Sequence, residues 1–239
     1  MTLRPNGKQG RTVIPADVSS PGSIPSAAHF PALEVGGFVP FTTVDYPGHL
    51  AAVVFCQGCH WRCRYCHNPH LQAFCPGQMH WDAILELLSE RRNFLEAVVF
   101  SGGEPTGQAA LPGAIRAVRD LGYQIGLHTA GIFPGRLADV LPLVHWVGLD
   151  IKAPFDARYD RITGREDSHE APAESLRLLL ASGVPYELRT TVHPELLTPS
   201  DMENLSQSLD SLGARPTKSQ PFRPDGCADL ELLGDTLPA

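Results

Sequence analysis

Residues 51–66 read AAVVFCQGCHWRCRYC, and this stretch joins a short apolar run to a cluster of cysteines. The run has the length and composition of a buried β-strand. Further apolar runs follow it, and segments with the apolar spacing of α-helices separate them. The expected strands are Ala51–Phe55, Ala97–Phe100, Gln124–Leu127, Trp146–Ile151, Tyr186–Val192 and Thr217–Pro221.

Helices are expected between these strands. Apolar residues recur at helical spacing over 81–88, 111–118 and 176–180, and a last helix is expected from Ser200 to Gly213, with Ser200 and Glu203 as a capping box. The alternation predicts a parallel sheet with right-handed crossovers. About six βα units are fewer than a closed eight-fold barrel needs, so a partial barrel or an open doubly wound sheet is expected. In both, ligands bind at the carboxyl ends of the strands.

Length and composition indicate one domain. The chain has 239 residues, and we expect residues 35–239 to form the domain and residues 1–34, rich in Pro, Ser and Gly, to be a flexible extension. The net charge of −7, without a Lys/Arg run, argues against nucleic acid as the main partner. No apolar stretch is long enough to span a membrane, and the first residues lack a secretory signal, so we expect a cytoplasmic protein without membrane association.

Four of the six cysteines fall within eleven positions, at Cys56, Cys59, Cys63 and Cys66. A cytosolic domain of this size favours a metal or redox site over disulfides. Thiolates select iron–sulfur clusters or zinc, and a zinc site that uses Cys56, His60 or His67 as a further ligand remains open here. Against it, no second cysteine pair follows downstream. Cys75 and Cys227 stand apart and are expected to be free thiols.

Polar and glycine residues follow several strands. Gly102 and Gly103 would let the backbone approach a ligand, and Glu104 offers an acceptor for an ammonium group. Asp150 and Lys152 lie at the end of the fourth strand, where charges are costly unless they pair or face a cleft. Arg189 lies on the fifth strand and requires an anion, which can be an internal carboxylate or a ligand.

The cysteine spacing Cys59-x3-Cys63-x2-Cys66, with Tyr65 before the last cysteine, resembles the radical S-adenosylmethionine (SAM) superfamily, and the GGEP segment at 102–105 resembles its second motif. Residues 37–48, 67–69, 152–154, 189–192 and 220–224 look like those of the longer anaerobic ribonucleoside-triphosphate reductase activating proteins, over roughly residues 36–226. The resemblance implies an α/β fold, the partial (β/α)6 barrel of the radical SAM type. It also implies that Cys59, Cys63 and Cys66 bind three irons of a 4Fe–4S cluster, whose fourth iron binds SAM. The implied cofactor-binding residues are Tyr65, Gly102, Gly103, Glu104, Thr129, Asp150, Lys152 and Arg189.

The function implied by the resemblance is that of a glycyl-radical enzyme activating enzyme. The cluster would take one electron from a donor such as flavodoxin or ferredoxin, SAM would be cleaved to methionine and a 5′-deoxyadenosyl radical, and the radical would abstract hydrogen from a glycine of a partner enzyme. That partner is expected to be anaerobic ribonucleoside-triphosphate reductase. No side chain need act as acid or base, since the cofactor performs the chemistry. The loop 154–172 could contact the partner, although a solvated loop is its default interpretation.

Two residues depart from the family pattern. Cys56 replaces an apolar residue and is either a spare thiol packed behind the cluster or an alternative ligand. His128 stands where some activases have Asp, which argues against a monovalent cation site beside Asp150. Two alternatives remain: a radical enzyme acting on a small molecule, like the 7-carboxy-7-deazaguanine synthases, and a non-enzymatic zinc or iron–sulfur protein. The second leaves Gly102-Gly103-Glu104-Pro105 and Asp150-x-Lys152 without a role.

Overall fold

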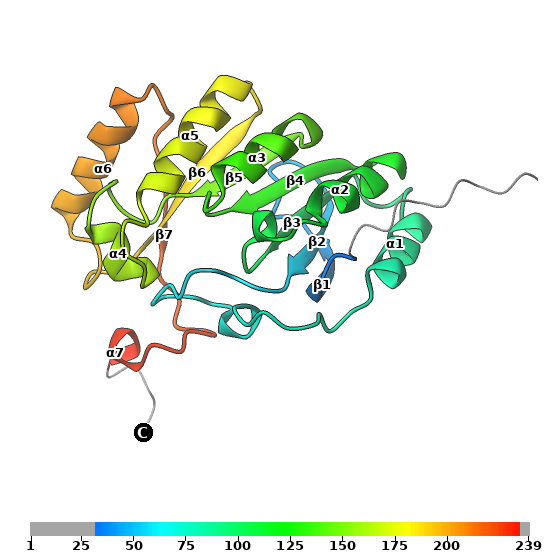
Figure 1. The fold of residues 1–239 in the computed structure, drawn as a ribbon, viewed down its shortest axis with the longest axis horizontal. Coiled ribbons are helices and arrows are strands. Elements are labelled where there is room, and N and C mark those ends of the chain that lie inside the picture. The colour runs from blue at the N-terminus through cyan, green and yellow to red at the C-terminus, as the bar shows by residue number, and fades with distance from the viewer. Residues whose placement is uncertain (1–31, 235–239) are drawn as a thin grey trace, which may run out of the picture.

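A computed structural model describes residues 32–234 of the chain, and its centre is one seven-stranded sheet with the strands in sequence order (Figure 1). Strands β2 to β7 pair in parallel, and β1 pairs antiparallel with β2. Strands β1 and β7 are the two edges, so the sheet does not close into a full barrel. The strands are β1 (Val35–Thr42), β2 (Ala51–Cys56), β3 (Ala97–Gly102), β4 (Gln124–Thr129), β5 (Trp146–Asp150), β6 (Tyr186–Val192) and β7 (Lys218–Pro221).

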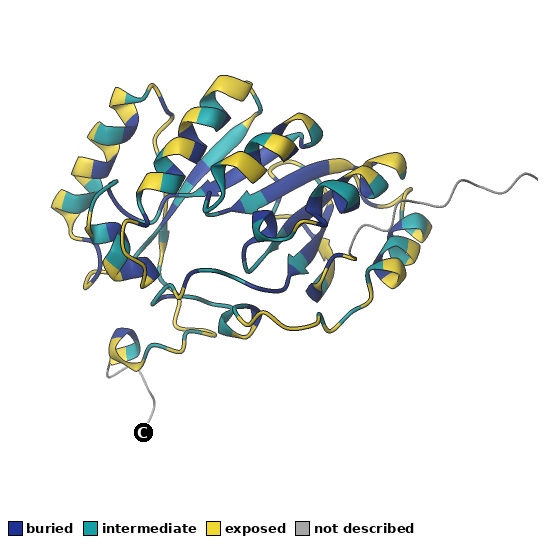
Figure 2. Cartoon of the chain, in the orientation of Figure 1, coloured by how far each residue is buried: buried dark blue, intermediate teal, exposed yellow. Residues whose placement is uncertain are grey.

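Strands β2 and β3 contribute to the core on both sides of the sheet because they are apolar on both faces. Strands β2 and β3 begin AAVV and AVVF, and these residues are almost completely buried (Figure 2). A parallel sheet needs such strands, since one face packs on the crossover helices and the other lines the barrel interior. The predicted partial parallel barrel is therefore confirmed, and all six predicted strands are present.

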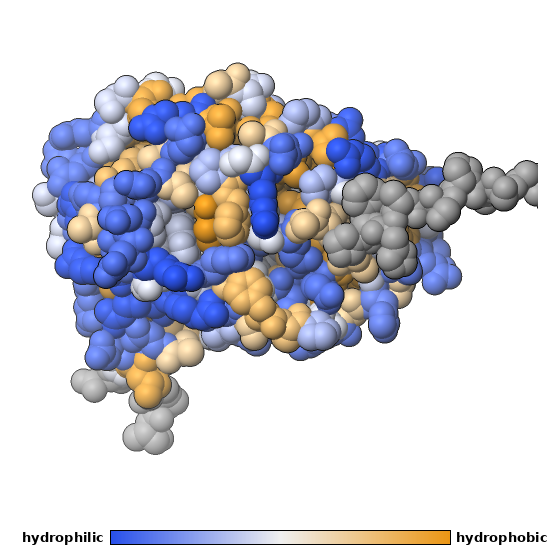
Figure 3. Space-filling model, viewed as in Figure 1, coloured by the Kyte–Doolittle hydropathy of each residue, from blue (hydrophilic) through white to orange (hydrophobic). Residues whose placement is uncertain are grey.

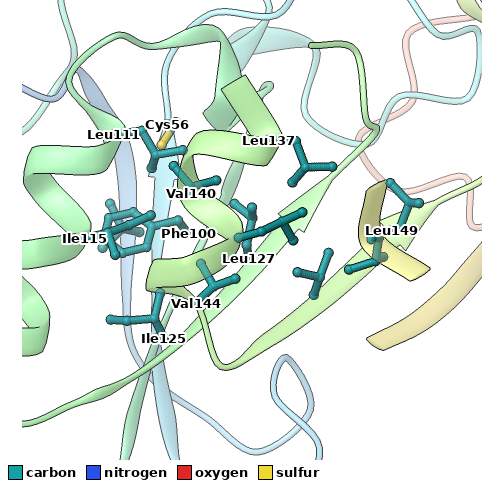
Figure 4. Packing of buried hydrophobic residues seen from close by; sticks show 14 of the residues in the cluster. Cys56, Phe100, Leu111, Ile115, Ile125, Leu127, Leu137, Val140, Val144 and Leu149 are labelled. Atoms are coloured by element: carbon teal, nitrogen blue, oxygen red, sulfur yellow. The ribbon is translucent and has the colours of Figure 1, made fainter. Parts of the chain in front are cut away.

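Five longer helices follow strands and cover the outer side of the sheet (Figure 1). Figure 4 shows how α2 inserts Leu111 and Ile115 toward Phe100 and Ile125 of the sheet. The spacing of three and four between buried residues gives each helix one apolar face. These helices are α1 (Trp81–Glu90), α2 (Leu111–Asp120), α3 (Pro134–Val140), α5 (Glu170–Ser182) and α6 (Pro199–Ser211), and the short helices are α4 (Arg158–Thr163) and α7 (Leu230–Leu233).

The structure corrects the sequence-based expectations in several places. Strand β1 was not expected, and it carries Pro40 and two glycines, which are rare in strands. The expected loop 154–172 contains α4. Helix α6 begins earlier than expected: its capping box is formed by Thr198 and Asp201, not by Ser200 and Glu203. Leu33, which precedes the expected start of the domain, is buried. Residues 1–31 of the expected extension lie outside the described residues.

The loop between β1 and β2 turns into the barrel interior. Tyr46 is buried there, stacks on Trp146 with ring centroids 5.4 Å apart, and donates a hydrogen bond to Gln124. Gly126 of β4 leaves room for this tyrosine, because a Cβ at that position would lie 3.2 Å from the Tyr46 ring. The interior below the carboxyl edge of the sheet is therefore filled by the chain's own side chains.

The described surface is mainly hydrophilic on the side shown in Figure 3, where hydrophobic residues appear only in small groups. Within residues 32–234, none of the helices combines the length and the apolar composition that crossing a membrane requires.

Candidate functional site

A cavity of about 420 Å³ opens at the carboxyl edge of the sheet. Each parallel strand contributes to its wall, and so does the loop that follows β2. Its position is the one expected for a ligand site in a parallel α/β fold. The strand residues that line it include Phe55, Ser101, His128, Asp150, Arg189 and Gln220, and all three predicted cluster cysteines line it as well.

The cysteine loop, residues 57–68, is fixed by backbone hydrogen bonds on two sides. Gly58 donates to the carbonyl of Leu71, and Arg62 and Arg64 donate to carbonyls at the end of α4, each at 2.8–2.9 Å. Within the loop, the Cys66 amide donates to the Cys63 carbonyl at 3.0 Å. These bonds define the backbone between the cysteines without using their side chains.

The turn after β3 contacts this loop directly. Gly103 donates a backbone hydrogen bond to the Cys56 carbonyl, and Glu104 donates one to the Gly58 carbonyl, both at 2.9 Å. A Cβ at Gly103 would lie 2.2 Å from the Gly58 oxygen, and Gly102 has a φ of +113°. Only glycine fits both the conformation and the space. The two glycines were predicted for close approach to a ligand, and they also permit the approach of the cysteine loop.

Glu104 does not line the cavity. Its side chain is buried, and its carboxylate accepts hydrogen bonds from the amide and hydroxyl of Thr106, the hydroxyl of Thr129 and the amide of Ala130, at 2.6–3.1 Å. Burial raises the pKa of Glu104, and these hydrogen bonds oppose the shift only in part. The carboxylate thus shapes the end of β4, where Thr129 and Ala130 do line the cavity. The contact between Glu104 and an ammonium group that the sequence suggests stays a prediction.

Charged side chains occupy the opposite wall. Asp150 and Arg189 are register partners on β5 and β6, and the carboxylate lies 2.9 Å from the guanidinium. Lys152 donates to the other carboxylate oxygen at 3.1 Å. Gly148 makes room for Arg189, because a Cβ there would lie 3.0 Å from the guanidinium carbon. The sequence left two possible anions for Arg189, and the structure identifies the internal one as Asp150.

Burial alone would raise the pKa of Asp150, but Arg189, Lys152 and His128 outweigh it and hold the pKa well below its usual value. For Lys152, burial lowers the pKa, but Asp150 raises it well above the ordinary lysine value. The Asp150 carboxylate and the Lys152 ammonium are therefore both charged at neutral pH. This wall offers a ligand both signs of charge.

His128 is a cavity residue whose placement the sequence did not predict. Its Nε2 lies 2.8 Å from the Asp45 carbonyl, to which it can donate, and its Nδ1 lies 3.4 Å from the Ser101 hydroxyl. Burial and the neighbouring Arg189 lower the pKa of His128 to about 4, so the ring is neutral at pH 7. The histidine joins the β1–β2 loop to the site. Its position at a strand end was the one available sequence signal.

Tyr65 lies under the charged wall. Its side chain is 3% exposed, and the Lys152 ammonium lies 5.7 Å from its ring centroid. Its hydroxyl is buried and has no hydrogen-bond partner among the described residues. Thr129 is also buried, with its hydroxyl on Glu104. The structure thus brings together around one cavity all of the predicted site residues except Glu104.

The donor set fits an iron–sulfur cluster. Cys59, Cys63 and Cys66 line one cavity, and all are free cysteines. Burial raises the pKa of Cys59 to about 11 and that of Cys63 to about 12, so without metal both are neutral thiols. Metal binding must displace their protons, which makes cluster assembly pH-dependent. Three thiols provide one ligand fewer than a four-iron cluster has irons.

Cys56 lies apart from these three. It is fully buried at the end of β2, belongs to the hydrophobic core and does not line the cavity (Figure 4). Burial, with a smaller effect of Glu104, raises the pKa of its thiol far above the ordinary value. Of the two sequence interpretations, this position fits the spare thiol packed in the core.

A partial barrel with three loop cysteines and a glycine turn at its carboxyl edge defines an iron–sulfur enzyme of the radical SAM class. Residues 53–207 match the model of the Radical SAM superfamily. A putative glycyl-radical enzyme activating enzyme from Methanocaldococcus jannaschii is 30% identical over 181 residues, which are 73% of this chain and 75% of that one. The pyruvate formate-lyase-activating enzyme of Clostridium pasteurianum is 34% identical over 128 residues, which are 51% of this chain and 53% of that one.

The fold is also found in solved structures. The structure of QueE from Escherichia coli superposes with a TM-score of 0.53 at 16% sequence identity, covering 86% of this chain and 91% of that chain. The chain belongs to the radical SAM superfamily, and within it to the activating enzymes of glycyl-radical enzymes. Its family uses a 4Fe–4S cluster and SAM, and the cysteines for the cluster are present.

Proposed function

We propose that this activating enzyme generates the glycyl radical of an anaerobic ribonucleoside-triphosphate reductase. The observation that carries the proposal is the single cavity that joins three free cysteines to a charged wall. The family supplies the reaction class. The choice of reductase is supported by the sequence segments at 37–48 and 220–224, which resemble those of reductase activators.

When bound, a 4Fe–4S cluster reduced by one electron would supply, together with SAM, the reductive cleavage of SAM and the removal of a hydrogen atom from a glycine of the partner. The role of the protein is to bind and orient these cofactors. Cys59, Cys63 and Cys66 would hold three irons, with the backbone of Gly102 and Gly103 beside them. The cluster is proposed to be reduced by a one-electron donor such as flavodoxin or ferredoxin.

Asp150, Lys152 and Arg189 are proposed to bind the polar parts of SAM. That molecule carries a carboxylate, an ammonium, a sulfonium and ribose hydroxyls, so it presents both signs of charge to its site. The wall does the same, with one carboxylate between two cations. Arg189 and Lys152 are already held by Asp150, so little side-chain ordering remains to be done when the ligand binds.

Glu104 is proposed to act through its neighbours. Its carboxylate holds the Thr129 hydroxyl and the Ala130 amide at 2.6 and 2.9 Å, and these residues line the cavity. Glu104 is therefore a positioning residue, and Thr129 is the cofactor-binding residue that it orients.

The segment 154–172 has less freedom to contact a partner than the sequence suggested. Tyr159 is fully buried, and its hydroxyl accepts a hydrogen bond from the Lys152 amide. Arg158 pairs with Asp156 and Asp201. Both residues serve the fold, and the exposed residues of this segment are the ones left for a partner.

The test is an anaerobic activation assay. The reconstituted protein, a reductant, SAM and a purified anaerobic ribonucleoside-triphosphate reductase are mixed, and the glycyl radical is measured by electron paramagnetic resonance while 5′-deoxyadenosine is quantified. We expect a radical on the reductase and matching 5′-deoxyadenosine, with neither formed by Cys63→Ala. A radical formed on pyruvate formate-lyase but not on the reductase would reject the proposed partner. Cleavage of SAM that never yields a protein radical would reject glycyl-radical transfer in this assay.

A further inference from the structure

The segment 222–233 lies against the cysteine loop, and we call it the C-terminal clasp. In Figure 1 it is the orange-to-red part of the chain that passes the cyan loop and ends in α7. A second cavity of about 240 Å³ lies between the two, lined by Cys63, Cys66 and Asp229 among others. Cys63 and Cys66 also line the main cavity, so the cysteine loop is the wall between the two cavities.

Arg64 is the main contact between loop and clasp. It stands between Cys63 and Cys66 in the sequence, and its guanidinium makes two hydrogen bonds to Asp229, at 2.6 and 3.2 Å, and one to Glu231 at 2.8 Å. Its carbonyl accepts a hydrogen bond from the Cys227 thiol at 3.3 Å. Its amide donates to the carbonyl of Ile162 in α4. One residue is thus held by its side chain, its carbonyl and its amide.

The clasp is itself fixed to the domain. Asp229 caps α7 by accepting from the amides of Glu231 and Leu232, so its carboxylate is oriented before it meets Arg64. Leu232 is buried, and its carbonyl lies 3.1 Å from Nε2 of the buried His193. His193 also packs edge-on against Phe222, at 4.9 Å between ring centroids. The arginine therefore binds a carboxylate that the fold has already placed.

A backbone contact completes the interface. Gly226 has a φ of +78°, and a Cβ there would lie 2.3 Å from the carbonyl oxygen of His67, the residue after the last cluster cysteine. No side chain fits between the clasp and the loop at this point. The contact brings the clasp onto the loop immediately beyond Cys66, while Arg64 fixes the loop immediately before it.

We propose that the C-terminal clasp is a positioning element for the iron–sulfur cluster, and that Arg64 is its positioning residue. By binding Arg64, the clasp fixes the backbone between Cys63 and Cys66 and so slows the release of the cluster. This inference rests on the proposed function only in that these cysteines are the cluster ligands. The matched superfamily region ends at residue 207, so the clasp lies outside it.

The physical reason is the cost of ordering. A loop that moves freely must lose conformational entropy each time its cysteines bind iron together. A loop fixed beforehand has lost that entropy on folding, so a cysteine that lets go of iron remains close and can bind again. Ligands held by such supporting contacts keep their geometry better than ligands on unsupported loops.

The first experiment measures cluster loss under anaerobic conditions. Reconstituted wild type, Arg64→Ala, Asp229→Ala and the double variant are mixed with an iron chelator, and the visible absorbance of the cluster is followed. Charge-assisted hydrogen bonds are lost in each variant, at a partly exposed site, so we expect loss at least about fivefold faster than in wild type. The double variant should be no faster than Arg64→Ala, and Arg64→Lys, which cannot bind bidentately, should be intermediate.

Arg177→Ala is the matched control, since it removes an exposed arginine–carboxylate pair, with Glu174, on α5. It should lose its cluster at the wild-type rate. Cluster loss from Arg64→Ala at the wild-type rate would overturn the proposal, as would an equal acceleration in the control.

The second experiment needs no cluster. Hydrogen–deuterium exchange of the metal-free protein should be faster in cysteine-loop peptides of Arg64→Ala than in wild type, and unchanged in α1. Exchange that rises equally in α1 and in the loop would show a general loss of stability and reject the positioning role. If wild type failed to bind any cluster, the proposed function would fail, while this experiment would still show whether the clasp fixes the loop.

Discussion

On the β2–β3 side of the cavity the contacts are made by backbone groups, whereas on the β5–β6 side they are made by charged side chains. The cysteine loop and the turn at Gly102 and Gly103 touch through amides and carbonyls. The opposite wall consists of Asp150 between Lys152 and Arg189. Substitutions that add atoms should therefore destabilise the β2–β3 side most, whereas substitutions that remove charge should destabilise the β5–β6 side most.

The largest effect is expected from Gly102→Ala. The added Cβ would lie 2.4 Å from the Cys56 amide nitrogen, in a conformation with φ of +113° that side chains rarely adopt. We expect the free energy of unfolding to fall by more than about 3 kcal/mol, measured by denaturant titration of the metal-free protein.

The control is Gly113→Ala in α2, where a Cβ meets nothing within 4 Å. Alanine is the better helix former, so this variant should be more stable by about 0.5–1 kcal/mol. If Gly102→Ala and Gly113→Ala changed the free energy of unfolding by the same amount, the turn after β3 would have no special requirement for glycine.

A smaller effect is expected from Asp150→Asn. Two cations then remain in the cavity wall without their carboxylate, and we expect a loss of about 1–3 kcal/mol at pH 7. The pKa of Asp150 is held below its usual value, so its contribution is fully present above the unfolded pKa of about 4 and is lost as the pH falls through the folded value.

The stability difference between wild type and Asp150→Asn should therefore shrink as the pH falls below about 4. Denaturant titrations across this range measure it. Glu174→Gln, which removes an exposed ion pair, is the control and should change stability by less than about 0.5 kcal/mol. A pH-independent difference between Asp150→Asn and wild type would show that charge is not what this residue contributes.

The smallest effect is expected from Cys56→Ala. Its thiol is buried in the core, so we expect a loss of about 1 kcal/mol in unfolding free energy and an unchanged iron content after reconstitution. Cys63→Ala, in the cysteine loop that follows β2, should lose the cluster. Equal iron loss in the two variants would show that Cys56 is also a cluster ligand.

The sequence predicted the parts of the fold that depend on local apolar patterns. Strands β2, β3 and β5 are mostly apolar runs, and the three cysteines lie in the loop that follows the first of them. Strand β1 escaped prediction because Pro40 and two glycines weaken its local signal, and its pairing with β2 is decided by tertiary structure. Helix α4 escaped because it is only six residues long.

The site residues were predictable as a set, but their contacts were not. Arg189 and Asp150 are 39 positions apart, and only the strand register makes them neighbours. Glu104 was predicted to contact an ammonium group, and only the structure shows that its carboxylate accepts hydrogen bonds from Thr106, Thr129 and Ala130. A motif names residue types at a strand end, whereas the direction in which a side chain points depends on partners distant in sequence.

The unpaired edges of the sheet have a mechanical consequence. In a closed barrel, widening the interior means breaking a ladder of interstrand hydrogen bonds. Here no ladder joins β1 to β7, so the seam between them can spread while all six existing ladders stay intact. The sheet therefore does not fix the width of this seam, and the rigidity beside the cysteines comes from the backbone hydrogen bonds of the cysteine loop to Leu71, Ile162 and Thr163.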